Sequence, residues 1–223
     1  MIPKIIHCFW SGGPKTKLAE KCLASWRRFA PDYEIREWNI SNLLNLSNFF
    51  RDAVVARKWA MASDWARMAV LKEHGGIYLD LDVELVAPVE RLPKGEWVAG
   101  EWTVRGDVWM NPGSGLALEK DSPVAVDMLE RYAQLAFDPN REMMTWINES
   151  LAEVMSDRGR VLRVLAPEVM SPIGIDGKLH RTEKTVGIHW YAMSWASPRR
   201  KIAKWLSWHG LRPAVDFMLK LRK

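Results

Sequence analysis

Two aspartates with one residue between them are the feature of this sequence that most plainly suggests chemistry. Asp80 and Asp82 flank a leucine near the end of residues 77–83. If that stretch is an extended strand, alternate side chains share a face, which puts both carboxylates on one side with Cα atoms about 7 Å apart. Such a pair can bind a hard divalent cation, Mn²⁺ or Mg²⁺, with phosphate oxygens and water completing its shell. Taken alone, the same pattern more often forms a solvated polar face.

An aspartate and an arginine on the preceding segment add to this pattern. Residues 60–73 contain no helix breaker and place Asp64 and Arg67 three positions apart, on one face of the expected helix. An aspartate accepts hydrogen bonds from ribose or sugar hydroxyls, and an arginine neutralises or orients a phosphate. The alternative is an ordinary ion pair on the helix surface.

The elements that must position these side chains alternate between strand and helix. Residues 4–10 are apolar enough for a buried strand, residues 18–29 have helical spacing, and residues 33–38 alternate as a second strand. Strand, helix and strand in that order indicate a parallel sheet with a crossover. Further strands are expected at 97–102, 108–110, 161–165 and 186–190, and further helices at 123–136 and 145–155.

The composition favours one folded domain with an appended tail. The chain has 223 residues, of which 48% are hydrophobic and 26% are charged. That length supports one substantial core but is short for two. We therefore expect a single α/β domain over residues 1–198 and a separate tail over residues 199–223. The 13 tryptophans are an unusually large number, which suits ligand platforms as well as core packing.

The tail carries the basic charge of the chain. Residues 199–223 hold eight Lys or Arg residues and one acid, so the rest of the chain has slightly more acidic than basic side chains although the net charge is +5. This distribution argues against nucleic-acid binding. Ile202, Trp205 and Leu206 recur at helical spacing beside lysines, which indicates an amphipathic helix on an anionic membrane surface. The alternative is a packed C-terminal helix with a solvated basic face.

Cysteine usage and hydropathy bear on the compartment. Cys8 and Cys22 have neither metal-ligand spacing nor the density of a disulfide scaffold, so we expect two buried thiols and a reducing environment. Residues 1–10 lack the pattern of a signal peptide, and no apolar run approaches the roughly 20 residues that span a bilayer. These features predict a cytoplasmic protein, with peripheral attachment to the inner face of the membrane through the tail.

Residues 63–84 closely resemble the sugar-binding D-x-D region of glycosyltransferase family 32. That family includes bacterial capsular and lipopolysaccharide transferases and fungal mannosyltransferases, and it is similar in this region to the large glucosylating bacterial toxins. Two further segments share the resemblance, residues 2–13 and residues 182–195. It therefore spans roughly residues 2–195, in three blocks that occur in the same order.

The resemblance implies a fold and an activity. The fold is a single GT-A domain, a Rossmann-like nucleotide-sugar-binding unit with a mixed, mostly parallel sheet. The activity is metal-dependent, retaining transfer of a sugar from a nucleotide sugar, with UDP favoured by the likeness to the toxins. The acceptor is a saccharide or lipid-linked molecule of surface polysaccharide or lipopolysaccharide synthesis. The alternatives are a toxin-like effector that glycosylates a protein and a non-catalytic membrane-binding module.

The resemblance also assigns roles around the two aspartates. Asp82 matches the residue that binds the metal directly, and Asp80 matches the contact to the donor sugar or ribose, which reaches the metal partly through water. Asp64 and Arg67 match donor-sugar contacts. Arg67 and the metal would then stabilise the negative charge that develops on the departing nucleoside diphosphate.

Residues farther along the chain receive roles in the same way. Trp10 matches the aromatic position beside the nucleobase, with a core tryptophan as the alternative. His189 corresponds to a C-terminal histidine that reaches the metal, although a lone histidine is more often structural. Ser194 and Trp195 resemble the toxins' pair that contacts the metal and the leaving phosphate. Asn111 falls in a small-residue loop beside the reacting sugar.

The loop that holds Asn111 departs from the family at Pro112, which weakens the assignment of Asn111. Glu101 and Asp107 are acids close to this loop in the sequence. A catalytic role is open to each of them, but a surface charge is the stronger interpretation, and no residue is assigned as a catalytic base.

Overall fold

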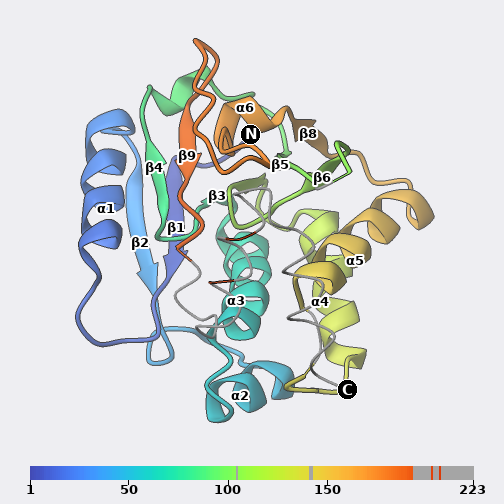
Figure 1. Ribbon diagram of the computed structural model, residues 1–223. Helices are drawn as coiled ribbons and strands as arrows, with labels where there is room; N and C mark the ends of the chain where they lie inside the picture. The colour runs from blue at the N-terminus through green and yellow to red at the C-terminus, as the bar shows by residue number, and fades with distance from the viewer. Residues whose placement is uncertain (104, 141–142, 193–201, 203–205, 207–223) are drawn as a thin grey trace.

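The computed structural model describes residues 1–103, 105–140 and 143–192, together with Ile202 and Leu206 (Figure 1). Its centre is a mixed sheet in which the strand order is β2-β1-β3-β7-β5-β6, with β8 paired to β5. Helices cover both faces of this sheet (Figure 1). The α/β architecture predicted from the sequence is therefore confirmed.

The first unit of the sheet is a parallel pair of strands joined by a helix. β1 (Ile5–Phe9) pairs in parallel with β2 (Glu34–Trp38), and α1 (Lys17–Phe29) connects them. The helix begins where the Thr16 side chain accepts a hydrogen bond from the backbone N–H of Ala19, a standard N-cap. Strand, helix and strand thus occur as the apolar pattern predicts.

A long helix then delivers the chain to the middle of the sheet. α3 (Trp59–His74) ends at two glycines, and β3 (Gly76–Tyr78) follows beside β1 in parallel. Gly75 and Gly76 have φ angles of 63° and 109°. A Cβ on Gly76 would lie 2.6 Å from the carbonyl oxygen of Ile5, so only glycine permits this close turn from helix to strand.

The remaining strands of the sheet include antiparallel pairings. β7 (Leu116–Leu118) runs antiparallel to β3 and β5, and β5 (Trp97–Trp102) forms a hairpin with β6 (Val108–Met110). β8 (Arg163–Leu165) is parallel to β5. Within the described part of this central sheet, three pairings are parallel and three are antiparallel, so the expected mixed sheet is present without the predicted parallel majority.

Two hydrophobic clusters pack on opposite faces of the sheet. One cluster holds Tyr78 and Leu116 together with four helices, whereas the other holds Ile77 and Ala117 together with α1. Neighbouring residues of one strand thus enter different clusters, as the period of two in a strand requires. The four helices are α2 (Asn48–Val55), α3, α4 (Pro123–Gln134) and α5 (Met143–Asp157).

A small second sheet lies beside the first. β4 (Val83–Leu85) and β9 (Gly187–His189) pair antiparallel, with Val83 opposite His189. Two short helical turns lie on the same side, η1 (Val89–Arg91) and α6 (Pro167–Met170). The pairing brings the late segment that ends at His189 against the residue that follows Asp82.

The structure corrects the expected geometry of the two aspartates. The strand ends at Tyr78, and Asp80 to Asp82 form a turn in which the N–H of Val83 donates to the carbonyl of Asp80 at 2.9 Å. The alternation predicted for residues 77–83 therefore fails after Tyr78. The carboxylates converge because the chain turns, and not because they share a strand face.

Several expectations concern residues outside the described part of the chain. Ser194, Trp195 and most of the tail at 199–223 lie there, so the assignments made for them remain predictions. Among the residues that the structure describes, no helix is long and apolar enough to cross a membrane.

Candidate active site

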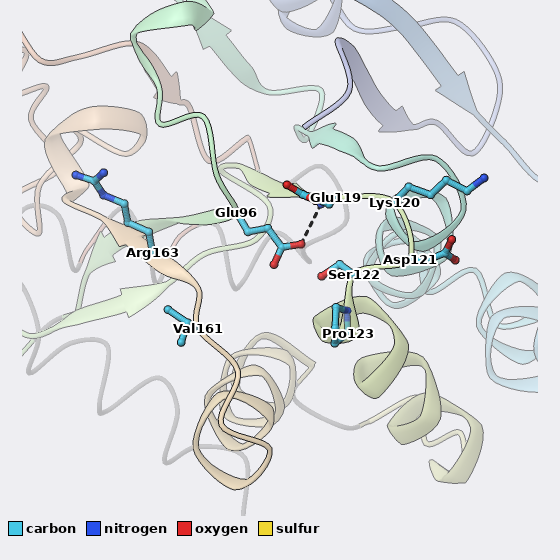
Figure 2. A pocket seen from close by; sticks show the side chains of 8 residues that line it. All are labelled: Glu96, Glu119, Lys120, Asp121, Ser122, Pro123, Val161 and Arg163. Atoms are coloured by element: carbon cyan, nitrogen blue, oxygen red, sulfur yellow. Dashed lines mark hydrogen bonds between the residues drawn. The ribbon is translucent and has the colours of Figure 1, made fainter. Parts of the chain in front are cut away.

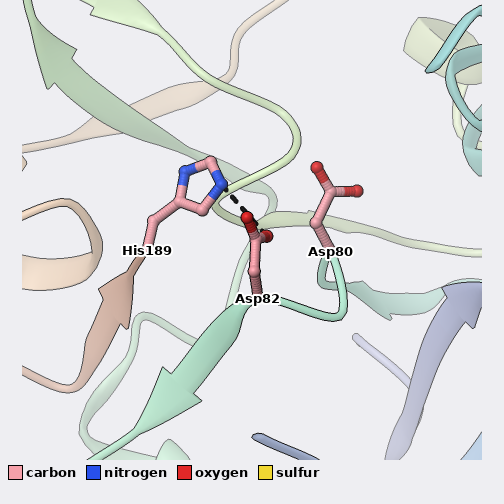
Figure 3. Close-up of side chains that lie close together, drawn as sticks. All are labelled: Asp80, Asp82 and His189. Carbon is pink, nitrogen blue, oxygen red and sulfur yellow. Dashed lines mark ion pairs between the residues drawn. The ribbon is translucent and has the colours of Figure 1, made fainter. Parts of the chain in front are cut away.

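The turn between β3 and β4 presents two carboxylates beside a histidine (Figure 3). The Nε2 atom of His189 lies 3.2 Å from Oδ1 of Asp82, and ligand atoms of Asp80, Asp82 and His189 all lie within 4.8 Å of one another. Two carboxylate oxygens and one imidazole nitrogen form a donor set that suits a divalent cation such as Mn²⁺. The residues predicted for the metal are thus together in space.

The segment after β9 holds Asp82 in place through its backbone. The N–H of Ala192 donates to Oδ2 of Asp82 at 2.8 Å, and the N–H of Trp190 donates to the Asp82 carbonyl at 2.9 Å. Between them, Tyr191 adopts a φ of 50°, which is uncommon for a residue with a side chain. The Tyr191 ring lies against His189 with 4.1 Å between ring centroids.

Arg67 is a buried cation that joins the helix to the turn. Its guanidinium donates to Asp64 Oδ1 at 2.9 Å and to Asp80 Oδ1 at 3.1 Å, and its side chain is only 3% exposed. The guanidinium also lies 4.7 Å from the centre of the Tyr78 ring. Asp64 and Arg67 therefore do not form the surface ion pair that was the alternative reading; they belong to the same cluster as Asp80.

Burial and neighbouring charges shift the pKa values of the three aspartates in different directions. Burial raises the pKa of Asp64 to about 7 although Arg67 opposes this shift. Burial likewise raises the pKa of Asp80 against the opposing charge of Arg67. Burial acts in the same sense on Asp82, but His189 and the N–H of Ala192 outweigh it and lower the pKa of Asp82.

His189 has its second ring nitrogen fixed by a serine. Its Nδ1 atom lies 2.6 Å from the hydroxyl of Ser114, and both side chains are buried. Burial alone would lower the pKa of His189, but Asp82, Asp80 and Glu101 reverse the effect and raise it. If Nδ1 donates its proton to Ser114, Nε2 presents a lone pair toward the two aspartates.

The loop with Asn111 packs directly against Asp80. Oδ1 of Asn111 accepts from the N–H groups of Gly113 and Ser114 at 3.0 and 3.1 Å, and the Gly113 carbonyl accepts from the N–H of Asp80 at 2.9 Å. A Cβ on Gly113 would collide with Asp80 Oδ2. Asn111 thus shapes the loop that supports Asp80, while its predicted contact with the reacting sugar stays a prediction.

Glu101 is part of this cluster and not an isolated surface charge. Its Oε2 atom accepts from Asn111 Nδ2 at 2.7 Å and from the Tyr191 hydroxyl at 3.0 Å. The carboxylate thereby ties the loop after β6 to the segment after β9. Asp107, in contrast, is exposed in the β5–β6 hairpin loop, as expected for a surface charge.

Trp10 follows β1 at the same edge of the sheet. It is partly buried, packs against the cluster that includes α1, and donates from Nε1 to the carbonyl of Gly13 at 2.9 Å. The parallel neighbours β1 and β3 end at one edge, so Trp10 lies on the side of the sheet from which the Asp80 turn emerges. Its contact with a nucleobase remains a prediction.

Sequence reasoning missed Ser114, Tyr191 and the role of Gly113. Each contributes through contacts between segments that are far apart in the chain, and no local pattern marks them. The one available signal was the run of small residues around Gly113 and Ser114, which is typical of loops that let other groups approach closely.

A hollow of about 510 Å³ lies elsewhere in the fold (Figure 2). Its lining includes Glu96, which immediately precedes β5, whereas Glu101 lies near the other end of that strand. Much of its polar wall is already engaged, since Glu96 accepts a hydrogen bond from the backbone of Glu119 at 3.0 Å. The hollow is separate from the carboxylate cluster, because its lining includes none of Asp80, Asp82 and His189.

Residues 16–99 match a known protein family. A family model described as glycosyltransferase sugar-binding region containing DXD motif matches residues 16–99. Asp64, Arg67, Asp80 and Asp82 all lie inside the matched residues. Residues 16–99 thus match this glycosyltransferase region, and the resemblance inferred for the two aspartates is confirmed.

Two curated proteins share the same part of the chain. An uncharacterised glycosyltransferase of Acanthamoeba polyphaga mimivirus is 35% identical over 95 residues, which cover 37% of this chain and 36% of the viral protein. Toxin Afp18 of Yersinia ruckeri serotype O1 is 36% identical over 85 residues, covering 37% of this chain and 4% of the toxin. The chain thus spans only a minor part of the length of either relative.

Two solved structures share the fold more completely. PaToxG glycosyltransferase superposes with a TM-score of 0.55 at 19% identity and covers 70% of both chains. A glycosyltransferase involved in the glycosylation of the major capsid of PBCV-1 gives a TM-score of 0.53 at 15% identity, over 85% of this chain and 95% of the other. At these identities the likeness establishes the fold, which is GT-A-like.

Proposed function

We propose that this protein is a metal-dependent glycosyltransferase that moves a sugar from a nucleotide sugar to an acceptor hydroxyl. The observation that carries this proposal is the convergence of Asp80, Asp82 and His189 within 4.8 Å, at a turn that lies inside the matched sugar-binding region. Arg67 lies beneath the same turn, bound to Asp80. A divalent cation would offset the negative charge of the Asp80 and Asp82 carboxylates and of a bound diphosphate.

The donor set fits Mn²⁺, with Mg²⁺ as the alternative. His189 offers the lone pair of Nε2 in the neutral tautomer whose Nδ1–H donates a hydrogen bond to Ser114. Asp82 offers a carboxylate whose lowered pKa keeps it ionised. When bound, the cation acts as a Lewis acid that stabilises charge on the diphosphate. A nitrogen ligand beside carboxylates suits Mn²⁺ better than Mg²⁺, which favours oxygen ligands and water.

The protein's own residues then perform two tasks. Asp64 and Asp80 accept hydrogen bonds from hydroxyls of the donor sugar or ribose, and Arg67 fixes both carboxylates and supplies positive charge. In the reaction the bond from the anomeric carbon to the phosphate oxygen breaks and its electron pair leaves with the diphosphate. The acceptor oxygen bonds to that carbon, and its proton passes to the departing phosphate.

We further propose that the transfer retains the anomeric configuration. Retention follows from attack on the face that the diphosphate leaves, where the leaving oxygen can take the acceptor's proton. The cluster supports this route because Asp64 and Asp80 are already engaged by Arg67 at 2.9 and 3.1 Å. Two opposed and unengaged carboxylates would instead suit glycoside hydrolysis. Trp10, Ser194 and Trp195 are proposed as further donor contacts, and UDP as the nucleotide.

The acceptor is proposed to be a saccharide or lipid-linked molecule of surface polysaccharide or lipopolysaccharide synthesis. The likeness to a bacterial toxin and to PaToxG favours a second candidate, a protein acceptor in a toxin-like effector. A purely non-catalytic membrane-binding module is the least supported alternative, because it would not need Asp64, Arg67, Asp80 and Asp82 together.

The basic tail at residues 199–223 is proposed to attach the enzyme to the cytoplasmic face of the membrane. Eight basic residues in this segment match an anionic lipid surface. Vesicles that contain anionic lipid should retain the full chain and release it when the tail is deleted. Equal retention of both forms, or of neither, would remove this assignment.

A panel of nucleotide sugars tests the activity. UDP-glucose, UDP-galactose, UDP-N-acetylglucosamine and GDP-mannose are titrated into the protein by calorimetry with and without Mn²⁺, alongside Asp82→Ala and the surface control Asp52→Ala. We expect one donor to bind in a Mn²⁺-dependent way to the parent and to the Asp52 variant, but not to Asp82→Ala. If no donor binds, or if Asp82→Ala binds equally well, the proposed function is wrong.

A further inference from the structure

The hairpin of β5 and β6 leads out of the candidate site and carries two exposed tryptophans. Trp102 and Trp109 are each 46% exposed, an unusual state for so large an apolar side chain. β6 is the outer strand of the sheet path, and the hairpin projects at its margin (Figure 1). The two rings therefore lie on the surface of the hairpin whose strand β5 also carries Glu101.

Strand register separates the two tryptophans onto different faces of this hairpin. Trp109 is paired with Glu101, whereas Trp102 is paired with Val108. Side chains of directly opposite residues lie on the same face, about 5 Å apart at their Cβ atoms. Trp109 therefore lies on the face of Glu101, and Trp102 lies on the other face.

The face that carries Glu101 is the face that reaches the site. Oε2 of Glu101 accepts from Asn111 at 2.7 Å and from the Tyr191 hydroxyl at 3.0 Å. Asn111 holds the loop that supports Asp80, and Tyr191 packs on His189. Trp109 is thus opposite Glu101, which bonds the side chains of Asn111 and Tyr191 beside the proposed metal and donor cluster.

Glu101 also has an oxygen to spare. Within the part of the chain that the structure describes, both hydrogen bonds go to Oε2, and Oε1 accepts none. An aromatic ring and a carboxylate on the same face of a hairpin match a pyranose, which has an apolar face of C–H groups and hydroxyls around its rim. A single ring with an adjacent acceptor suits a sugar better than a peptide, which would be held mainly by backbone hydrogen bonds along a strand.

We propose that Trp109 and Glu101 form the acceptor subsite, in which a saccharide acceptor stacks a sugar ring on the Trp109 indole and donates a hydroxyl hydrogen bond to Glu101 Oε1. This inference rests on the proposed glycosyltransferase function and specifies the acceptor class. The acceptor would then lie between the hairpin and the donor cluster, with a second hydroxyl of the sugar directed at the reacting carbon.

The hairpin offers a matched pair of variants for the test. Trp109→Ala removes the proposed platform, and Trp102→Ala removes an equally exposed tryptophan from the opposite face. The assay uses the labelled nucleotide sugar that the protein hydrolyses as the donor, and p-nitrophenyl hexosides as acceptors. It records the ratio of label transferred to the hexosides to label released as free hexose. Because that ratio is internal to each protein sample, a partly unfolded variant does not distort it.

We expect Trp109→Ala to lower the transfer ratio about tenfold, which is the size of one aromatic stacking contact. Trp109→Phe should recover part of the loss, and Trp102→Ala should keep the parental ratio. The acceptor KM should rise in Trp109→Ala, because the lost contact is made to the acceptor.

The possible failures are distinguishable. If the parent neither binds nor hydrolyses any nucleotide sugar, the proposed function itself fails. If the parent hydrolyses a donor but transfers nothing to the hexosides, or transfers to a peptide instead, the saccharide assignment is overturned. If Trp109→Ala transfers with the parental ratio, or if Trp102→Ala loses as much, the subsite is not on the Glu101 face of the hairpin.

Discussion

At the scale of single residues, Arg67 determines how the carboxylates are arranged. A guanidinium that is 3% exposed can be tolerated only with well-placed partners, and Asp64 and Asp80 supply them. The sequence predicted that Asp64 and Arg67 share a helix face. It could not predict that the ion pair is buried and extends to Asp80, because that contact depends on how the helix packs against the turn.

Ser114 provides a test of His189 as a ligand of the proposed metal, because its hydroxyl contacts the His189 ring. Removing its hydroxyl frees Nδ1 of His189, so the ring loses the partner that orients it. Such outer contacts typically change metal affinity about 10- to 100-fold. We expect Ser114→Ala to weaken Mn²⁺ binding by that amount, measured by the electron paramagnetic resonance signal of free Mn²⁺.

The exposed Ser156 on α5 is the matched control for this substitution, and Ser156→Ala should bind Mn²⁺ as the parent does. Unchanged Mn²⁺ affinity in Ser114→Ala would show that His189 does not need the hydrogen bond and would weaken its assignment as a ligand.

Among the elements, apolar patterns predicted the longer strands and the helices α1, α3, α4 and α5 well, but they did not predict α2 or α6. β1, α1, β2 and α3 fall within a few residues of their expected bounds. β4 and β7 were missed. Each has only three residues and therefore a weak pattern, although the equally short β6, β8 and β9 fell inside expected strands.

The Asp80 turn shows why alternation misled the prediction. Residues 77–83 alternate as a strand would, yet the chain leaves the sheet after Tyr78. The loop from Asn111 to Ser114 fills the place of a strand partner, since the Gly113 carbonyl accepts from the N–H of Asp80 at 2.9 Å. That long-range contact has no local signal in the sequence.

Gly113 tests the fit between this loop and the turn. A methyl group at Gly113 would meet the Asp80 carboxylate, so Gly113→Ala must displace one of the two segments. We expect donor turnover to fall about 100-fold, since small displacements of positioned groups have effects of this size. Turnover is measured with the donor identified in the binding panel.

Gly95→Ala is the control, because a Cβ there meets no atom within 4 Å. It should leave turnover near the parental value. Parental turnover in Gly113→Ala would show that the loop is not needed to hold Asp80.

At the scale of the whole molecule, His7 links three parts of the fold. It is completely buried; its Nδ1 atom accepts from the Trp38 indole at 2.9 Å, and its Nε2 atom donates to the Gly75 carbonyl at 2.8 Å. These bonds connect β1 to β2 and to the glycine turn before β3. The bond from Trp38 requires the neutral ring, because a protonated Nδ1 cannot accept.

This link makes stability depend on pH. Burial lowers the pKa of His7 from 6.5 to about 4. The unfolded chain therefore binds the proton first as pH falls, and the free energy of unfolding decreases between about pH 6.5 and pH 4. A shift of this size corresponds to about 3 kcal/mol across that window.

Urea unfolding from pH 7 to pH 4 measures this effect. The parent should lose stability across the window, and His7→Gln, although less stable at pH 7, should show a shallower decline. Equal slopes for the two proteins would mean that other groups govern the pH dependence.

The overall fold is shared more widely than the residues of the candidate site. Two structures with TM-scores of 0.55 and 0.53 share this architecture at 19% and 15% identity, so the GT-A-like frame tolerates wide change in sequence. The site residues at the β3–β4 turn are a small part of the chain. In the proposed reaction, the chemistry of these residues, and not the fold, would decide what is transferred.

The central claim is that a metal held at Asp82 drives cleavage of a nucleotide sugar. The most direct measurement is the steady-state rate of hexose release from the donor that binds best, in Mn²⁺ and in EDTA, for the parent, Asp82→Asn and the surface control Asp52→Asn. We expect EDTA to abolish release and Asp82→Asn to lower kcat/KM by at least about 100-fold, a loss typical of removing one preorganised electrostatic contact. Asp52→Asn should match the parent. Release that persists in EDTA, or parental kcat/KM in Asp82→Asn, would contradict this claim.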